Sequence, residues 1–264
     1  LGPRAAIGGI GAKPIDRLGR EGHEPSLAQG TRGILDFGGA RHGGSIAVRC
    51  GSGYKRPMTT LLFTHDSSLR HVTPEGHPER VDRIRAVNQI LGSEHFRDLT
   101  RRAAPAGREE DILRAHVQEH LRRVKAIAPA EGFEFLDADT AMSPGTLEAA
   151  LHAVGAATAG VDAVFSGEAD NVFCALRPPG HHAESRRAMG FCFFNQAAIA
   201  AHYARAAHGA ERVAVIDFDV HHGNGTQDIF WSDPDLFYGS THQMPLYPGT
   251  GSVHETGAGN IFNA

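Results

Sequence analysis

From about residue 58 onward, short apolar runs alternate with longer stretches in which apolar residues recur at helical spacing. Four runs have the length and composition of buried strands: 60–65, 171–177, 212–220 and 236–242. Four stretches predict helices: 77–91, 109–127, 143–167 and 193–209. We expect Pro78 in the first turn of the first helix and Gly209 at the end of the last. Strands separated by helices indicate a three-layer α/β/α fold with a mainly parallel central sheet.

Residues 1–57 show neither pattern. This segment holds fourteen of the 32 glycines, with nine basic and four acidic residues. It offers too little apolar surface to offset the entropy of ordering the chain, so we expect a disordered, glycine-rich extension. The first methionine, Met58, stands where the globular pattern begins, which favours an extension or a misplaced start. A basic binding tail is the alternative interpretation.

The composition is that of an ordinary soluble domain. A length of 264 residues, a formal charge of −4 and a hydrophobic content of 41% favour one α/β domain of catalytic size. The lack of net positive charge argues against direct nucleic-acid binding. No apolar run is long enough to cross a membrane. The distant positions of Cys50, Cys174 and Cys192 argue against a disulfide framework and favour a cytoplasmic location. The sequence leaves the oligomeric state open.

The apolar run at 212–220 leads directly into charged residues, in the sequence IDFDVHHGNG. Along an extended strand alternate side chains share a face, so Asp217, Asp219 and His221 are expected to point together. Three ionisable groups at the end of a buried strand are costly to desolvate without a compensating ion. Because carboxylate and imidazole are zinc ligands, the pattern predicts a divalent metal site. A salt-bridged strand end is the alternative, and it accounts less well for three groups in register.

A second polar group follows the strand predicted at 171–177. There the sequence RPPGHHAE presents His181 and His182 after a rigid Pro-Pro-Gly loop. Ligands of parallel sheets bind at the carboxyl ends of the strands, so both histidines are expected at the same edge as the metal site. Adjacent histidines alone are a weak signal. Their position relative to the aspartate-rich motif gives them weight.

Several long motifs, in this order, resemble the histone deacetylase superfamily. They are the histidine-rich segment at 65–83, DADTAMSPGTLEAA at 137–150, RPPGHHAE and GFCFFN within 177–195, DFDVHHGNGTQDIF at 217–230, and STHQMPLYPGTG at 240–251. The resemblance covers essentially all of 58–264 and implies an arginase/deacetylase-like α/β/α fold. Bacterial members of the superfamily also include acetylpolyamine amidohydrolases and acetoin-utilisation proteins. The asparagine in HHGNG resembles the class II pattern.

The resemblance implies a metal-dependent hydrolase of linear amide bonds. Asp219 and His221 match two of the three protein ligands of one catalytic Zn²⁺. The backbone around Asp217, Asp219, His221 and Ser240 matches a structural K⁺ site. Gly223 stands where arginase-like enzymes carry a further aspartate, so a two-metal site is disfavoured.

A pair of residues that handles protons is also implied by the resemblance. His181 matches the histidine oriented by a carboxylate, here Asp217, and His182 matches its neighbour, which faces Asn224. A carboxylate behind an imidazole favours its protonated form, whereas an amide only orients the ring. We therefore expect His182 to act as the general base, with a pKa separated from that of His181.

Substrate contacts are implied in the same way. Gly190, Phe191 and Tyr247 match the lining of a narrow tunnel that admits an acylated lysine or a similar amine. Arg83 matches an arginine in an internal cavity behind the metal. Acetylated protein lysine, acetylated polyamine and other small acyl amides all remain open as substrates.

The resemblance stops short of a complete site. In the family a third metal-binding aspartate and an oxyanion-stabilising tyrosine follow the YPGTG motif at some distance, whereas this chain ends at GNIFNA. We therefore expect residues 58–264 to be the N-terminal portion of a histone deacetylase-like domain, truncated and incomplete at its C-terminus. An inactive, truncated module that binds a metal or an acyl ligand is the second alternative.

Overall fold

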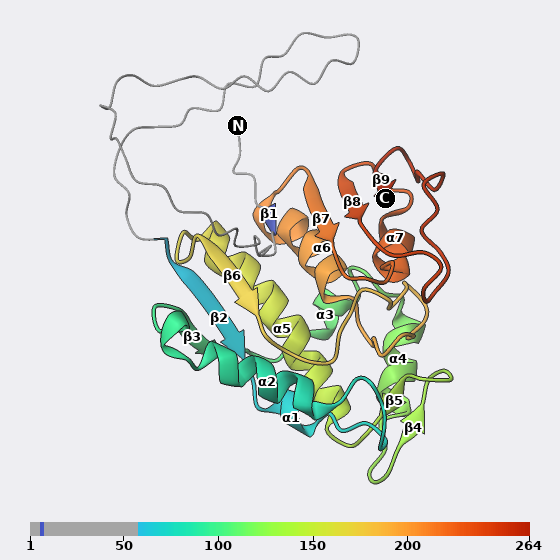
Figure 1. Ribbon diagram of the computed structural model, residues 1–264. Helices are drawn as coiled ribbons and strands as arrows, with labels where there is room; N and C mark the ends of the chain where they lie inside the picture. Colours follow the sequence, from blue (N-terminus) through green and yellow to red (C-terminus); the bar gives the residue numbers. More distant parts are fainter. Residues whose placement is uncertain (1–5, 8–57) are drawn as a thin grey trace, which may run out of the picture. The chain divides into compact units, whose positions relative to one another are not determined.

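A computed structural model of the chain describes residues 6–7 and 58–264 (Figure 1). The strands are β1 (Ala6–Ile7), β2 (Thr60–Thr64), β3 (Thr100–Ala103), β4 (Glu134–Phe135), β5 (Ala141–Met142), β6 (Asn171–Cys174), β7 (Val213–Asp217), β8 (Leu236–Ser240) and β9 (Ile261–Asn263). The helices are α1 (Ser67–Arg70), α2 (Val81–Leu91), η1 (Glu94–Phe96), α3 (Glu109–Ile112), α4 (Gln118–Ala126), α5 (Thr146–Phe165), α6 (Gln196–His208) and α7 (Asn224–Phe230). The disorder predicted for 1–57 lies outside the described residues, except that Ala6–Ile7 form β1.

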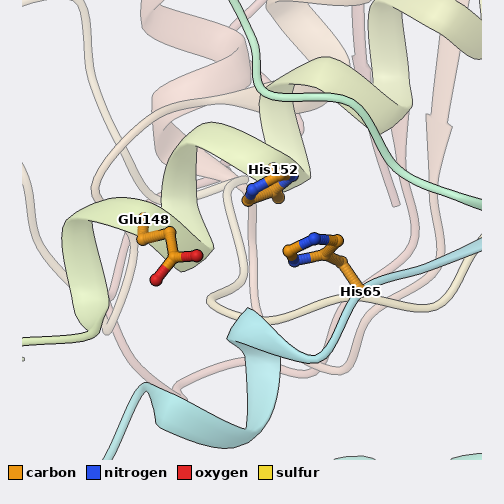
Figure 2. Close-up of side chains that lie close together, drawn as sticks. All are labelled: His65, Glu148 and His152. Carbon is orange, nitrogen blue, oxygen red and sulfur yellow. The ribbon is translucent and has the colours of Figure 1, made fainter.

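Strand β2 is the centre of a parallel three-stranded sheet in the order β3-β2-β6. Its side chains alternate between two helical layers, because Leu61 and Phe63 pack with alanines of α5 and Leu62 packs with the end of α2. The first predicted strand and the α/β/α layering are therefore confirmed here. The loop after β2 also lies against α5, where the His65 ring stacks on the ring of His152 (Figure 2).

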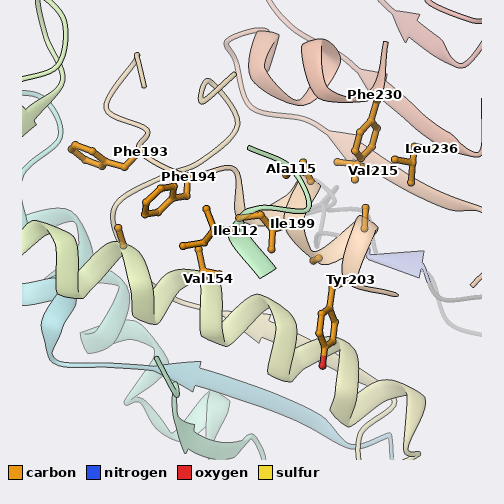
Figure 3. Packing of buried hydrophobic residues seen from close by; sticks show 14 of the residues in the cluster. Ile112, Ala115, Val154, Phe193, Phe194, Ile199, Tyr203, Val215, Phe230 and Leu236 are labelled. Carbon is orange, nitrogen blue, oxygen red and sulfur yellow. The ribbon is translucent and has the colours of Figure 1, made fainter. Parts of the chain in front are cut away.

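A second sheet has four parallel strands in the order β1-β7-β8-β9. Val213 and Val215 of β7 enter the largest buried cluster together with Leu236 of β8 and Ile199 of α6 (Figure 3). Ile216, the residue after Val215, is half exposed on the other face. This packing holds β7 in place up to its carboxyl end, where the charged motif begins at Asp217.

Helix α2 begins at Val81, four residues later than the helix predicted at 77–91. Pro78 therefore precedes the helix instead of occupying its first turn, and that prediction is wrong. The reason is tertiary: the side chain of Glu79 turns inward to Arg177, and this contact holds the chain in an extended approach to the helix.

The helix predicted at 109–127 is divided into two. Helix α3 ends at Ile112 and α4 begins at Gln118. In the bend between them the N–H of Val117 donates to the carbonyl oxygen of Ser185 at 3.0 Å, which replaces a bond within a helix. A periodic sequence cannot reveal a competing partner so far away along the chain.

Helices α5 and α6 lie within their predicted ranges. Helix α5 begins at Thr146, after a turn in which Thr146 N–H donates to the carbonyl of Ser143. Asn195 caps α6 through its side chain, which accepts the N–H of Ala198 at 3.0 Å. Gly209 ends α6 with a φ of 68°, as predicted for a glycine after a helix.

The strands that carry the candidate site are shorter than their apolar runs. Strand β6 ends at Cys174 and β7 ends at Asp217. Asp219 and His221 therefore lie in a loop, and the extended conformation predicted for them is wrong. The reason is that the N–H of Asp219 donates to the Asp217 side chain, at 3.1 Å, instead of to a neighbouring strand. Helix α7, which follows this loop, was not predicted.

The parallel strands of residues 6–7 and 58–264 form these two hydrogen-bonded sheets, and β4 and β5 form a separate antiparallel pair. Strand β6 pairs with β2, and β7 pairs with β1 and β8, but β6 and β7 do not pair with each other. A groove of about 780 Å³ lies beside both strands, with Val172 of β6, Val215 of β7 and residues of α5 and α6 in its walls. His181 and Asp217 also line the groove. Within residues 6–7 and 58–264, no helix has the length and apolar character needed to cross a bilayer.

Candidate active site

The structure brings Asp217 and His181 into contact, although they belong to separate motifs. Nδ1 of His181 lies 2.9 Å from Asp217 Oδ2, and the hydroxyl of Tyr238 donates to the same oxygen at 3.0 Å. Burial disfavours the Asp217 carboxylate, but its bonds, above all the one to His181, outweigh burial and lower the pKa of Asp217. A carboxylate held in its ionised form orients the His181 ring.

His182 has an amide partner in place of a carboxylate. Asn224 Nδ2 donates to Glu184 Oε1 at 2.8 Å, which turns Asn224 Oδ1 toward His182 Nδ1, also 2.8 Å away. His182 therefore carries its proton on Nδ1 and keeps Nε2 as an acceptor. Burial, followed by the charge of His181, lowers the pKa of His182 to about 4. The two ring centroids are 4.0 Å apart, so two imidazoles with different partners stand side by side.

Asp219 and His221 lie next to each other in the loop after β7. Asp219 Oδ1 accepts the backbone N–H of His221 at 2.9 Å and is 3.1 Å from His221 Nδ1. Both side chains are about half exposed. The His221 ring also faces the ring of His182, with 6.1 Å between centroids. The loop therefore assembles beside the histidine pair the same groups that the sequence pattern had placed on a strand.

The turn at 189–192 presents two residues that were expected to line a tunnel. Its end residues exchange two backbone hydrogen bonds, and its central residues, Gly190 and Phe191, have φ angles of 56° and 69°. These values define a type I′ turn. Gly190 lies so close to His182 that an added Cβ would be 2.5 Å from a ring carbon. Tyr247 approaches the same ring edge-on, with 5.1 Å between centroids. Gly190 and Tyr247 therefore both border the His182 ring.

The remaining predicted residues divide into two cases. Ser240 of β8 is buried and is the register partner of Asp217 on β7, so these two potassium-site candidates are adjacent. Arg83, expected in an internal cavity, is instead 60% exposed and reaches Glu79 at 3.4 Å. That expectation is wrong, because Arg83 lies on the exposed side of α2. The buried arginine of this region is Arg177.

The sequence profile of the histone deacetylase domain matches residues 77–264. This chain belongs to the histone deacetylase family. It is 45% identical over 174 residues to the histone deacetylase-like amidohydrolase of Pseudomonas aeruginosa, an alignment that covers 66% of this chain and 46% of that protein. It is 38% identical over 205 residues to a probable deacetylase of Archaeoglobus fulgidus, covering 76% and 56%. The chain thus spans about half the length of these two relatives.

The fold of this histone deacetylase family member agrees with a solved structure of the family. The crystal structure of the HDA15 HD domain superposes with a TM-score of 0.74 at 35% identity, and covers 78% of this chain and 61% of that chain. The predicted α/β deacetylase fold is therefore confirmed.

Some contacts of the candidate site could not be predicted from the motifs. The hydroxyl of Tyr238 bonds to Asp217 and accepts the N–H of Gly223 at 3.0 Å. Glu184 orients Asn224. The signals were present but faint: a tyrosine in the largely apolar strand β8, and a glutamate two residues after the histidine pair.

The loop that carries His181 and His182 begins at Arg177, which belongs to a buried ion pair. Arg177 Nε donates to Glu79 Oε1 at 2.6 Å, and Nη2 donates to Oε2 of the same carboxylate. Arg177 Nη1 also donates to the carbonyl oxygens of Ser68 and His71, at 2.8 and 3.0 Å. Burial acts to raise the pKa of Glu79, but Arg177 outweighs it and holds this pKa at about 2. The base of the loop is therefore fixed by charge-assisted bonds.

Asp219 and His221 fit two positions of a zinc site. A carboxylate oxygen and an imidazole nitrogen 3.1 Å apart repel each other unless they share a proton or a cation. Catalytic zinc usually has three protein ligands. Within the described part of the chain, no third His, Cys, Asp or Glu completes a close group with this pair.

Another group of three does exist among the described residues, at His65, Glu148 and His152 (Figure 2). It does not fit a metal centre. The two rings are stacked with centroids 3.4 Å apart and planes at 14°, so one ion cannot lie in both ring planes. Both oxygens of Glu148 are bonded by Arg70. We therefore assign no metal to this group.

Proposed function

We propose that this chain carries the histidine pair and two metal ligands of a zinc-dependent amidohydrolase that removes acetyl or other acyl groups from lysine side chains. One observation carries the proposal: His181 on a carboxylate and His182 on an amide stand 4.0 Å apart beside Asp219 and His221. The family membership and the similarity to the histone deacetylase-like amidohydrolase of Pseudomonas aeruginosa support it.

Each residue has a task in this proposal. Asp219 and His221 would hold the metal, which when bound polarises the acyl carbonyl and acidifies a water molecule. The neutral His182 accepts a proton from the attacking water at Nε2. His181, whose Nδ1 faces the Asp217 carboxylate, donates a proton to the leaving amine. The substrate enters beside Phe191 and Tyr247.

Alanine at position 182 is expected to lower kcat by about 10²–10⁴-fold, because the acceptor for the water proton is lost. His181→Ala is expected to lower kcat as well and to change a different limb of the pH–rate profile, because its carboxylate-bound ring supplies a proton instead of taking one. Hydrolysis of an acetyl-lysine peptide across pH measures both effects. Unchanged profiles in both variants would contradict the assigned roles.

Metal content separates loss of the base from loss of the metal. After zinc loading and desalting, elemental analysis is expected to find zinc retained in His182→Ala and lost in His221→Ala. The exposed His95 offers the matched control, since His95→Ala should change neither zinc content nor rate. Zinc retained in His221→Ala would refute that ligand.

An acetylated polyamine or another small cationic amine is the second candidate substrate, and two carboxylates favour it. Asp137 and Asp139 precede Thr140, whose hydroxyl accepts the N–H of Phe191 at 3.1 Å. Both aspartates are partly exposed. Burial, followed by the charges of these aspartates, raises the pKa of Tyr247. A negative border near Phe191 and Tyr247 attracts a substrate with positive charge beyond its acyl group.

Asp139→Asn is expected to lower kcat/KM for an acetylated polyamine by about two- to fivefold, the effect of one exposed charge pair. It should leave kcat/KM for an acetyl-lysine peptide without other cations unchanged. Asp98→Asn, on the exposed surface, serves as the control. Equal losses on both substrates would exclude charge recognition. Zinc binding without hydrolysis of either substrate would favour the inactive binding module.

A further inference from the structure

The segment 184–195 joins the histidine pair to α6 and carries the type I′ turn described above. Its two ends converge on one side chain. Nδ1 of His116 lies 2.9 Å from the carbonyl oxygen of Glu184, and the N–H of Asn195 donates to His116 Nε2 at 2.9 Å. His116 comes from the bend between α3 and α4 and is 3% exposed. One imidazole therefore closes the base of the segment.

Only one tautomer of His116 satisfies both contacts. A carbonyl oxygen only accepts and a backbone N–H only donates, so Nδ1 must carry the proton and Nε2 must be free of it. Burial, followed by the charge of His120, lowers the pKa of His116 to about 3, which agrees with a neutral ring. A second proton on the ring would remove the bond from Asn195.

Neighbours of His116 hold the same segment. Nε2 of His120, on α4, lies 2.8 Å from the carbonyl oxygen of Phe193, and its ring centroid is 4.8 Å from that of His116. The N–H of Val117 donates to the carbonyl of Ser185. In and just after the break between α3 and α4, the His116 ring, the Val117 N–H and the His120 ring therefore all bond to the segment.

Other residues of the segment contact His182 and its partner Asn224. Glu184 Oε1 accepts from Asn224, and Asn224 in turn faces Nδ1 of His182. Gly190 lies directly against the His182 ring. A displacement at the base of the segment would therefore move both the partner and the neighbour of His182.

We propose that His116 is a positioning residue of the deacetylase site, which fixes segment 184–195 as its Nδ1–H tautomer and thereby sets the place of His182. The inference rests on the proposed function for the role of His182, while the contacts of His116 stand independently of it. His116 lies outside the motifs that predicted the site and acts only through the segment.

Nuclear magnetic resonance of the ¹⁵N-labelled chain tests the tautomer directly. Long-range couplings at neutral pH are expected to show a protonated Nδ1 in His116. His116→Phe keeps a ring and removes both bonds, whereas His116→Gln restores an acceptor for Asn195. We expect kcat on an acetyl-lysine peptide to fall by about tenfold or more in His116→Phe, with a smaller change in KM, and to recover partly in His116→Gln. His202→Phe, a partly buried histidine of α6, is the matched control and should retain wild-type kcat.

An Nε2–H tautomer in the wild-type chain overturns the proposal, and so does a folded His116→Phe variant with wild-type kcat. If the unmodified chain hydrolyses no acetylated amine, the proposed function fails instead. The positioning role is then decided by the ring shifts of His182 and the hydrogen exchange of the Asn195 amide. Both are expected to change in His116→Phe, and unchanged values would refute the role.

Discussion

Alanine at position 190 is expected to lower kcat by about a hundredfold or more, because it displaces His182, the proposed general base, by a distance that catalysis does not tolerate. The added methyl group would lie 2.5 Å from Cδ2 and 2.7 Å from Cγ of His182, closer than carbon atoms pack. A φ of 56° also disfavours alanine, by roughly 1–2 kcal/mol. Steady-state kinetics on an acetyl-lysine peptide, together with the melting temperature, measure the two effects.

Gly132→Ala is the matched control for this prediction. Gly132 has a φ of 67°, close to that of Gly190, but an added Cβ would meet nothing within 4 Å. Gly132→Ala therefore introduces the same unfavourable φ for alanine but no steric clash. It should lower the melting temperature and leave kcat unchanged. Equal kcat in Gly190→Ala and Gly132→Ala would show that the turn does not press on His182.

Glutamine at position 79 is expected to reduce the free energy of unfolding by about 3–5 kcal/mol, because it leaves the buried guanidinium of Arg177 without a counter-charge. A double variant, Glu79→Met with Arg177→Met, should lose less than the sum of the two single changes, since it removes both buried charges. Urea denaturation at pH 7 measures each variant. Glu94→Gln, in an exposed pair with Arg97, is the control, with an expected loss of about 1 kcal/mol or less.

Acid adds an independent check on the Glu79–Arg177 pair. The pKa of Glu79 is about 2 in the folded chain, below its ordinary value of 4.5, so the folded state favours the carboxylate. The stabilisation is therefore complete above pH 4.5 and is lost as the pH falls toward 2. Unfolding measured across this window should depend less steeply on pH in Glu79→Gln than in the wild type. An identical dependence would mean that Glu79 is not held as a carboxylate.

The sequence predicts the groups of the candidate site better than it predicts their geometry. Asp217, Asp219 and His221 do gather, but through side-chain bonds to backbone N–H groups after β7 ends, and no strand pattern encodes those bonds. The resemblance implied the contact of His181 with Asp217, whereas topology placed both residues only at the carboxyl ends of parallel strands. The topology of a parallel sheet predicts which residues lie at its carboxyl edge, but it does not predict which of their atoms form contacts.

Residues that support the site were harder to predict, since their partners are distant in the chain. Glu79 and Arg177 are 98 positions apart, and each belongs to a motif that shows no sign of the other. His116 lies in a stretch whose periodicity indicates an uninterrupted helix, yet contacts with segment 184–195 break that helix. Periodicity reports which face of an element is apolar. It carries no information about a backbone group that arrives from elsewhere to compete for a hydrogen bond.

Phe191 occupies a backbone conformation that phenylalanine disfavours. Its φ of 69° costs roughly 1–2 kcal/mol relative to a residue suited to that region. The same conformation aims its ring at His77, with 4.8 Å between centroids. Glycine or asparagine at this position would relax the chain and at the same time remove an aromatic side chain that the proposed function places beside the substrate. Under that proposed function, laboratory selection for heat tolerance alone would erode discrimination between substrates.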